Sequence, residues 1–213
     1  TPPSLRGTLV VPGNIGGMQW GGAAFDAGSG LLVVPANHLP ALVRLIPQAE
    51  VDAYRKQFPD RENTRQRGTP YAMSREFLRS PSGLPCVRPP FGTLTAVDTV
   101  SGQIRWQVPL GALPGADPAW GSINLGGPLA TNGVIFIGAA LDPVFRAFHA
   151  QTGKELWRAQ LPASARSVPA TFTAASGAQY IVVAAGGHMT QFGKLDNAIV
   201  AFGLPNLPAD RTK

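Results

Sequence analysis

The sequence is poor in several features that mark common classes of protein. It has one cysteine in 213 residues, which excludes a disulfide framework and a cysteine-based metal site. Charged residues make up only 14% of the chain, far below the usual ~25%, so the composition is not that of a charge-rich disordered protein. The longest apolar runs, such as residues 180–185, are much shorter than the ~18–20 residues that span a bilayer. These shortages leave a folded chain without a predicted membrane helix.

Glycine and proline, in contrast, are abundant. The 25 glycines and 21 prolines together make up about 22% of the chain, against a usual ~12%. At this density the two residue types interrupt helices every few positions, which argues against a mostly helical fold. The composition predicts an all-β chain with many turns that is long enough to bury a core. Within it, Cys86 is expected to be a small buried apolar residue.

The net charge of +6 would suit a nucleic-acid partner, but the distribution of the charges argues against one. Between Arg44 and Arg79, eight basic residues are interleaved with five acidic residues. A surface that follows phosphates usually carries a cluster of one sign with aromatic residues between the charges. We therefore expect no nucleic-acid partner and interpret this segment as solvated surface.

Two stretches of the chain, residues 94–106 and 145–157, repeat one another at an offset of 51 residues. Each is a short alternating run, a polar turn with a glycine, and a second run that contains a tryptophan. Because glycine readily adopts the positive φ that tight turns need, each copy is predicted to be a β-hairpin. The shared positions are Ala96 and Ala147, Gly102 and Gly153, and Trp106 and Trp157.

A second type of hairpin alternates with the first, at residues 20–34, 127–138 and 168–185. Two hairpins in every ~50 residues make a four-stranded unit, and repeated units of this kind with periodic glycine and tryptophan are typical of a β-propeller. About three such blades can be counted. Propellers usually close with about four to eight blades, so residues 1–213 are expected to be the C-terminal part of a larger propeller.

The first blade is predicted to be interrupted by a mostly irregular and helical insertion at residues 40–92. Within it, residues 49–58 favour a short helix and residues 61–68 a polar, mobile segment. Residues 8–11 are expected to be the outer strand of a preceding blade, and residues 198–202 a third strand without a fourth. Open blade edges of this kind favour self-association.

The repeat carries the pattern Ala-x-Asp-x-x-(Ser/Thr)-Gly-x-x-x-Trp, best kept at residues 96–106. This pattern resembles the tryptophan-docking motif of the quinoprotein dehydrogenases, in which the tryptophan of one blade packs against the next. Trp106 and Trp157 are therefore expected to be docking residues. Further stretches are similar to the membrane-bound, pyrroloquinoline quinone (PQQ)-dependent glucose dehydrogenase branch, namely residues 13–22, 44–47, 68–71, 83–94 and 184–188.

The resemblance implies an eight-bladed propeller that carries PQQ with a calcium or magnesium ion against the quinone. Members of the family oxidise aldose sugars or other polyols at the periplasmic side of the bacterial inner membrane and pass electrons to ubiquinone. The resemblance also implies that the catalytic aspartate, a lysine that contacts the cofactor and most metal ligands belong to earlier blades. We therefore expect no metal ligand in this chain, and no dehydrogenase activity without the missing blades.

The resemblance implies that Gln19 and Trp20 lie against PQQ, and Gly21 keeps the backbone small near the axis of the ring. The alternative for Trp20 is a core residue in the first strand of a blade. Pro35 stands where many members of the family have an asparagine that approaches the cofactor. Because proline has no N–H to donate, Asn37 is the candidate substitute.

Two further residues are assigned to the substrate pocket by the resemblance. Asp142 would be a pocket acid, and the alternative is an aspartate that opens a turn before Pro143. His188 would hydrogen-bond a sugar hydroxyl, which an imidazole can do in either protonation state, and the alternative is a structural histidine at a strand end. Met189 and residues 196–197 depart from the family pattern, which leaves a preference for a substrate other than glucose open.

The sequence as a whole predicts the C-terminal segment of a PQQ-dependent sugar dehydrogenase. One alternative is a non-catalytic propeller that serves as a scaffold for protein binding, against which the Gly-Gly-His ending at residues 186–188 and the long insertion both count. The other is a quinoprotein alcohol or polyol dehydrogenase, against which the lack of adjacent cysteines counts.

Overall fold

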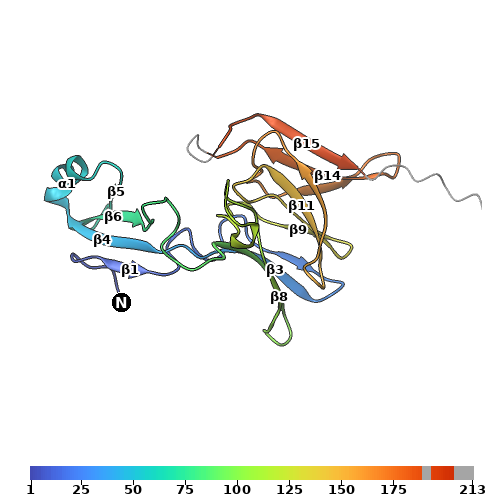
Figure 1. Cartoon of the computed structure of the whole chain (residues 1–213), viewed down its shortest axis with the longest axis horizontal. Coiled ribbons are helices and arrows are strands. Elements are labelled where there is room, and N and C mark those ends of the chain that lie inside the picture. The colour runs from blue at the N-terminus through green and yellow to red at the C-terminus, as the bar shows by residue number, and fades with distance from the viewer. Residues whose placement is uncertain (189–192, 204–213) are drawn as a thin grey trace, which may run out of the picture.

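The computed structural model describes residues 1–188 and 193–203, and these fold almost wholly into antiparallel sheets (Figure 1). Three of the sheets follow one another as blades. Blade 1 has the strand order β2 (Ala24–Asp26), β3 (Leu31–Asn37), β7 (Gly92–Asp98), β8 (Ile104–Pro109). Blade 2 has β9 (Leu129–Thr131), β10 (Val134–Ile137), β11 (Val144–His149), β12 (Glu155–Gln160). Blade 3 has β13 (Ala170–Thr173), β14 (Gln179–Ala185) and β15 (Ala198–Gly203), so the prediction of a partial propeller of about three blades is confirmed.

The sequence repeat corresponds to a structural repeat. In blade 1, Ala96 pairs with Trp106, and in blade 2 Ala147 pairs with Trp157. Both hairpins shift register immediately after this alanine, which is the irregularity that a β-bulge produces. The same spacing of alanine, glycine and tryptophan therefore gives the same strand pairing in both blades.

The hydrophobic cores lie between blades rather than within one. Alternation along each strand turns one set of side chains toward the neighbouring blade. The first core joins Leu31, Val33, Leu94 and Trp106 of blade 1 to apolar residues of blade 2, among them Ile135, Ile137 and Phe148. The second joins Phe145 and Leu161 of blade 2 to Ile181, Val183 and Ala185 of blade 3. Each blade is thus stabilised chiefly by the one beside it.

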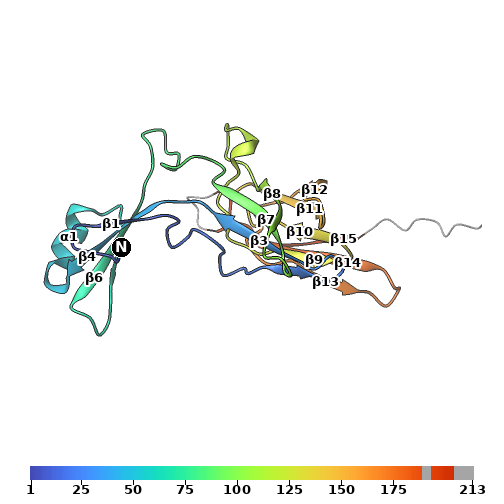
Figure 2. The same cartoon turned by 90° about the horizontal axis from the view of Figure 1, so that it is seen from below.

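The segment between β3 and β7 and a strand from the start of the chain together form a fourth sheet, which stands to one side of the blades in both views (Figures 1 and 2). Its order is β1 (Thr8–Val10), β4 (Ala41–Pro47), β6 (Tyr71–Phe77), β5 (Glu62–Arg65). The expected helix is present as η1 (Gln48–Glu50) and α1 (Val51–Gln57), and Val51 packs in a small core with Ile46 and Ala72. We call this unit the insertion sheet.

Three local expectations are wrong. Residues 8–11 do not belong to a preceding blade, because β1 pairs with the free edge of β4. Residues 61–68 are not a mobile segment, because β5 pairs with β6 and salt bridges join Arg61 to Glu76 and Arg75 to Glu62. Cys86 is exposed rather than buried, since it lies in a surface connection that is held to Leu78 through its backbone N–H, at 3.0 Å.

The remaining helical segment is the short turn η2 (Pro118–Trp120), between blades 1 and 2. Neither it nor η1 nor α1 has the length and apolar character that a bilayer-crossing helix requires, among the residues that the structure describes.

Candidate functional site

The three blades begin at a common rim, and each contributes a side chain to it from the same position. Trp20, Leu125 and Arg166 each stand four residues before the first strand of their blade, which is β2, β9 or β13. All three line one cavity of about 400 Å³. We call this the rim cavity.

The second strands of the blades end at the same rim, because each first hairpin returns the chain to the side from which it came. Leu141, after β10, and His188, after β14, both line the rim cavity. The insertion sheet adds Arg75 and Phe77 of β6 to its wall. The cavity is therefore bounded by all three blades and by the insertion sheet.

Trp20 and Gln19 both line the rim cavity. Their contact with a cofactor stays a prediction. Trp20 lies outside strand β2, and 70% of it is exposed. A core tryptophan would be buried, so the alternative reading of Trp20 does not fit this structure. The Gln19 amide donates a long hydrogen bond, 3.4 Å, to the carbonyl of Gly16, which turns the side chain along the loop.

Gly21 lies at the closest approach of blades 1 and 2. A Cβ atom on Gly21 would lie 2.3 Å from the carbonyl carbon of Gly126, and one on Gly127 would lie 1.9 Å from the Gly21 oxygen. Only bare backbones fit at this distance. Gly21 therefore allows the backbones of two blades to meet at the rim. It is not one of the described residues that line the rim cavity.

Asn37, at the end of β3, is only 1% exposed, and its side-chain amide is hydrogen-bonded to backbone groups of the protein. The Nδ2 group donates to the carbonyl oxygens of Ile15 and Asn124, each at 2.8 Å, and Oδ1 accepts from the backbone N–H of Asn124 at 2.7 Å. The residue ties the loop before β2 to the segment before β9. It lies behind the rim rather than on it, and its role in cofactor binding stays a prediction.

Asp142 is held in a salt bridge inside blade 2. Its Oδ1 and Oδ2 atoms accept hydrogen bonds from Nη1 and Nη2 of Arg146, at 2.9 and 2.6 Å. Nε of Arg146 also lies 3.7 Å from Oε2 of Glu155. Asp142 lines a neighbouring cavity with residues 112–114, and not the rim cavity. The structure therefore brings together Gln19, Trp20 and His188 but leaves Asp142 next to that group.

His188 is exposed and stands three residues beyond the end of β14. The backbone before it is fixed, since the N–H of Gly187 donates to the carbonyl of Ser164 at 2.9 Å. The ring is thus presented to the rim cavity from a constrained position. Met189, which departs from the family pattern, lies outside the described residues.

Three charged residues of the rim cavity had not been predicted: Glu62, Arg75 and Arg166. Glu62 and Arg75 form a salt bridge across β5 and β6, so their place depends on a sheet that the sequence pattern had not indicated. Arg166 is only 4% exposed, and burial lowers the pKa of its guanidinium to about 10. A signal for it was available: a single charge in the small-residue run 162–167, at the blade position that Trp20 occupies in blade 1.

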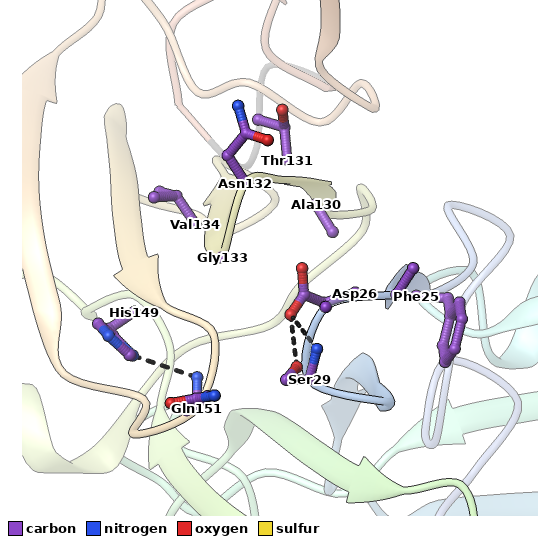
Figure 3. Close-up of a pocket in the computed structure, with 12 residues that line it drawn as sticks. Phe25, Asp26, Ser29, Ala130, Thr131, Asn132, Gly133, Val134, His149 and Gln151 are labelled. Carbon is purple, nitrogen blue, oxygen red and sulfur yellow. Dashed lines mark hydrogen bonds between the residues drawn. The ribbon is translucent and has the colours of Figure 1, made fainter.

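A larger cavity, of about 660 Å³, lies at the opposite end of the blades, beside the β2–β3 and β9–β10 turns (Figure 3). Two of its polar side chains stabilise turns, Asp26 the β2–β3 turn and His149 the turn between β11 and β12. The Asp26 carboxylate accepts from the N–H and the hydroxyl of Ser29, and Nδ1 of His149 accepts from the N–H of Gln151 at 3.2 Å (Figure 3). Asp26, Ser29 and His149 therefore stabilise the fold at this end of the blades. The residues with a predicted functional role lie at the opposite rim.

No group of three or more histidine, cysteine, aspartate or glutamate side chains lies together as a metal site in residues 1–188 and 193–203. The hydrogen-bond donors among the side chains that line the rim cavity are instead an indole, two amides, an imidazole and two guanidinium groups. Such a set binds an organic molecule with hydroxyl or carboxylate groups more readily than a bare cation.

Known proteins share both the sequence and the fold. Residues 1–181 match the protein family described as PQQ, glucose/ethanol/alcohol dehydrogenase, beta-propeller domain. The quinate/shikimate dehydrogenase (quinone) of Acinetobacter baylyi is 37% identical over 88% of this chain and 25% of its own length. The quinoprotein glucose dehydrogenase of Escherichia coli is 35% identical over 97% of this chain and 28% of its own.

The fold is that of solved quinoprotein structures. The quinohemoprotein alcohol dehydrogenase of Comamonas testosteroni superposes with a TM-score of 0.59 at 27% identity, over 84% of this chain and 24% of that one. The chain spans about a quarter of the length of the curated relatives that it matches. With a family match over most of its length and with blades of the same fold, the chain belongs to the PQQ-dependent glucose/ethanol/alcohol dehydrogenase β-propeller family.

Proposed function

We propose that this chain forms three blades of a PQQ-dependent dehydrogenase that oxidises an aldose at C1 and passes the electrons to ubiquinone. The observation that carries the proposal is the rim cavity, in which Gln19, Trp20 and His188 meet. Two quinoprotein glucose dehydrogenases, at 35% and 36% identity over 97% of the chain, support an aldose as substrate.

The rim cavity fits a planar quinone cofactor. The exposed indole of Trp20 offers a flat apolar face on which an aromatic ring system can stack. Beside it, the backbones of Gly21 and Gly127 pack directly on one another, which fixes the loop that carries Trp20 against blade 2. Gln19 supplies an amide for a quinone or carboxylate oxygen.

When bound, PQQ supplies the two-electron acceptor: the substrate loses a hydride from carbon and a proton from its hydroxyl, and an alcohol becomes a carbonyl. The residues of this chain orient the substrate for that step. His188 is placed to hydrogen-bond a ring hydroxyl, and Trp20 excludes water from one face of the site. The base, and the calcium or magnesium ion that polarises the quinone, are assigned to the other blades.

The outer faces of the first and last blades support the presence of further blades. On blade 1, Phe25 and Ile104 are 55% and 61% exposed, and on blade 3, Phe172 and Ile199 are 50% and 76% exposed. These faces are the reverse sides of the sheets that form the two inter-blade cores. Further blades, or a second copy of the chain, would bury them. By resemblance, the complete ring would lie at the periplasmic side of the inner membrane.

A second candidate is the oxidation of a polyol or a cyclic hydroxy acid. It is favoured by the relative from Acinetobacter baylyi, named for quinate and shikimate, and by the glycerol dehydrogenase large subunit of Gluconobacter thailandicus, at 34% identity over 97% of the chain.

The test is dye-linked turnover by the protein that contains this chain, loaded with PQQ and calcium and offered glucose, glycerol and quinate. We expect reduction of the dye with at least one of them, and none by residues 1–213 alone. Binding of PQQ with no turnover of any substrate would favour the scaffold alternative.

A further inference from the structure

A second cavity, of about 220 Å³, lies beside the rim cavity, and much of its wall comes from residues 78–91, which join β6 to β7. We call it the apolar chamber. Ile15, Phe77, Ile123 and Leu141 line both the apolar chamber and the rim cavity. A molecule that is bound at the rim therefore lies next to the chamber.

The lining of the chamber is almost wholly apolar. Leu39 and Phe91 are 4% and 3% exposed, and neither belongs to the hydrophobic cores of the described residues. Among the described residues that line the chamber, Arg79 alone has a polar side chain, and it is exposed, so its charged end can stay in water. A lining of this kind favours an apolar group over a bare sugar ring or an ion.

The volume of the chamber is larger than side-chain packing normally leaves. Protein interiors contain few voids larger than a water molecule, because the atoms around an empty space lose van der Waals contacts. An apolar cavity of about 150 Å³ is enough to bind benzene. At about 220 Å³, the chamber has room for one aromatic ring or a short alkyl chain.

Backbone hydrogen bonds hold the wall of the chamber in place. The N–H of Leu78 donates to the carbonyl of Pro40 at 3.3 Å, and the N–H of Phe91 donates to the carbonyl of Trp120 at 2.6 Å. The rings of Phe91 and Trp120 also pack in T-shaped geometry, with centroids 6.1 Å apart. Because the chamber is preformed, a group that enters it has few residues to order, and more of its burial energy remains as affinity.

We propose that the apolar chamber is a second part of the substrate site, and that the substrate is an aldose that carries a compact apolar group. The inference rests on the proposed function and deepens it. The sugar hydroxyls lie in the rim cavity, where Gln19 and His188 offer hydrogen bonds, and the apolar group lies in the chamber. The residues that line the chamber, Leu113 among them, are thus specificity-determining residues.

The experiment compares glucose with its benzyl ethers at O4 and at O6, with the PQQ-loaded holoenzyme that contains this chain. Both ethers keep the C1 hydroxyl and add one apolar ring. We expect at least one ether to have a kcat/KM about 10- to 100-fold above that of glucose, the gain when a group of this size leaves water. A kcat/KM for both ethers that is no higher than that for glucose overturns the proposal.

Leu113 allows the chamber to be altered by itself, because it lines the chamber and is not among the described residues of the rim cavity. Leu113→Trp fills the chamber and should lower the ratio of kcat/KM for the better ether to that for glucose about tenfold. The control Leu9→Trp makes the same change at a residue of β1 that is 58% exposed and lines neither cavity, and should keep the wild-type ratio. Equal ratios in the two variants overturn the proposal.

A second variant covers the case in which Leu113→Trp does not fold, which thermal unfolding reports. Leu113→Ala enlarges the chamber and should raise kcat/KM for the naphthylmethyl ether of glucose relative to that for the benzyl ether at the same oxygen. An unchanged ratio of these two values contradicts the assignment of the chamber.

An apolar electron acceptor could occupy the same chamber. The KM for a short-chain ubiquinone is therefore measured at saturating glucose in the wild type and in Leu113→Trp. A KM that rises in the variant while the ratio for ether and glucose stays at the wild-type value assigns the chamber to the acceptor and overturns the proposal. An unchanged KM for the quinone, together with the lower ratio, supports it.

If neither glucose nor its ethers are oxidised, the proposed function fails and the inference is judged by binding. Calorimetric titration of the same protein should then show tighter binding of an ether than of glucose, and a smaller difference in Leu113→Trp. Equal binding of glucose and both ethers to the wild-type protein would contradict the role of the chamber.

Discussion

The two docking tryptophans occupy the same position in the repeat but have different surroundings. Trp106 is 9% exposed, its Nε1 donates to the carbonyl of Ala150 at 2.7 Å, and its ring covers Gly153 of blade 2. Trp157 is 39% exposed, and its indole nitrogen makes no hydrogen bond within the described residues. Its ring packs in T-shaped geometry with Phe145 and Phe202, with ring centroids 6.2 and 5.0 Å apart.

The difference shows that the docking motif alone does not bury its tryptophan, because the tryptophan also needs a turn of the next blade to pack against. In blade 2 this turn is formed by residues 150–153. The described part of blade 3 ends with β15 at Gly203 and contains no turn after that strand to receive Trp157. One sequence pattern therefore gives a buried anchor or a half-exposed side chain, according to its neighbour.

Truncation of each tryptophan to alanine should give the largest difference in the free energy of unfolding between the two positions. Trp106→Ala removes a buried ring and its hydrogen bond, and should lower the free energy of unfolding by about 3–5 kcal/mol. Trp157→Ala removes a side chain that is already half exposed, and should cost about 1 kcal/mol. Urea denaturation of the chain measures both values. Equal losses would mean that docking does not distinguish the two residues.

The glycine beneath Trp106 offers a matched pair with a smaller effect. Gly153 and Gly102 occupy the same turn position, with φ of +68° and +70°. A Cβ on Gly153 would lie 2.6 Å from the Trp106 ring, whereas one on Gly102 meets no atom within 4 Å. Gly102→Ala should cost about 1 kcal/mol of backbone strain. Gly153→Ala should cost about 2–4 kcal/mol, because the ring must also move. A difference near zero in urea denaturation would contradict the stacking.

The smallest effect concerns the turn before Trp106. The backbone N–H groups of Ser101 and Val100 donate to Asp98 and lower the pKa of its carboxyl below 3.8. Because the folded pKa is the lower one, the stabilisation is complete above the unfolded pKa and is lost as the pH falls through the folded value. The stability difference between wild type and Asp98→Asn should thus be constant from about pH 5 to 8 and shrink below about pH 3.9. A difference that persists unchanged at pH 2 would point to another cause.

The blades could be predicted from sequence because their signals are local. A glycine that requires positive φ, such as Gly102, and a tryptophan a few residues later fix a hairpin wherever they occur. The insertion sheet could not be predicted in this way. Its strand β1 is short and pairs with β4, which is distant in the sequence, and its strand β5 is polar and pairs with the nearby β6. Pairing of this kind leaves little trace in the periodicity of either strand.

The residues of the rim cavity could be predicted only where they lie next to predicted blade strands. Gln19, Trp20 and His188 meet at the rim because they lie next to predicted strand ends. Arg75 was missed because it belongs to the insertion sheet. Arg166 was missed because its position is informative only when the first strands of the three blades are aligned with one another. Asp142 depends on the side chain of Arg146, which a pattern in the sequence does not reveal.

The central claim is that the rim of these blades faces PQQ, and titration of the apoprotein that contains this chain tests it most directly. PQQ is added with calcium while tryptophan fluorescence is followed, for the wild type, Trp20→Ala and the control Trp157→Ala. We predict saturable quenching in the wild type and the control, and in Trp20→Ala a loss of most of the quenching with about tenfold weaker binding. Quenching and affinity that are unchanged in Trp20→Ala would contradict the account.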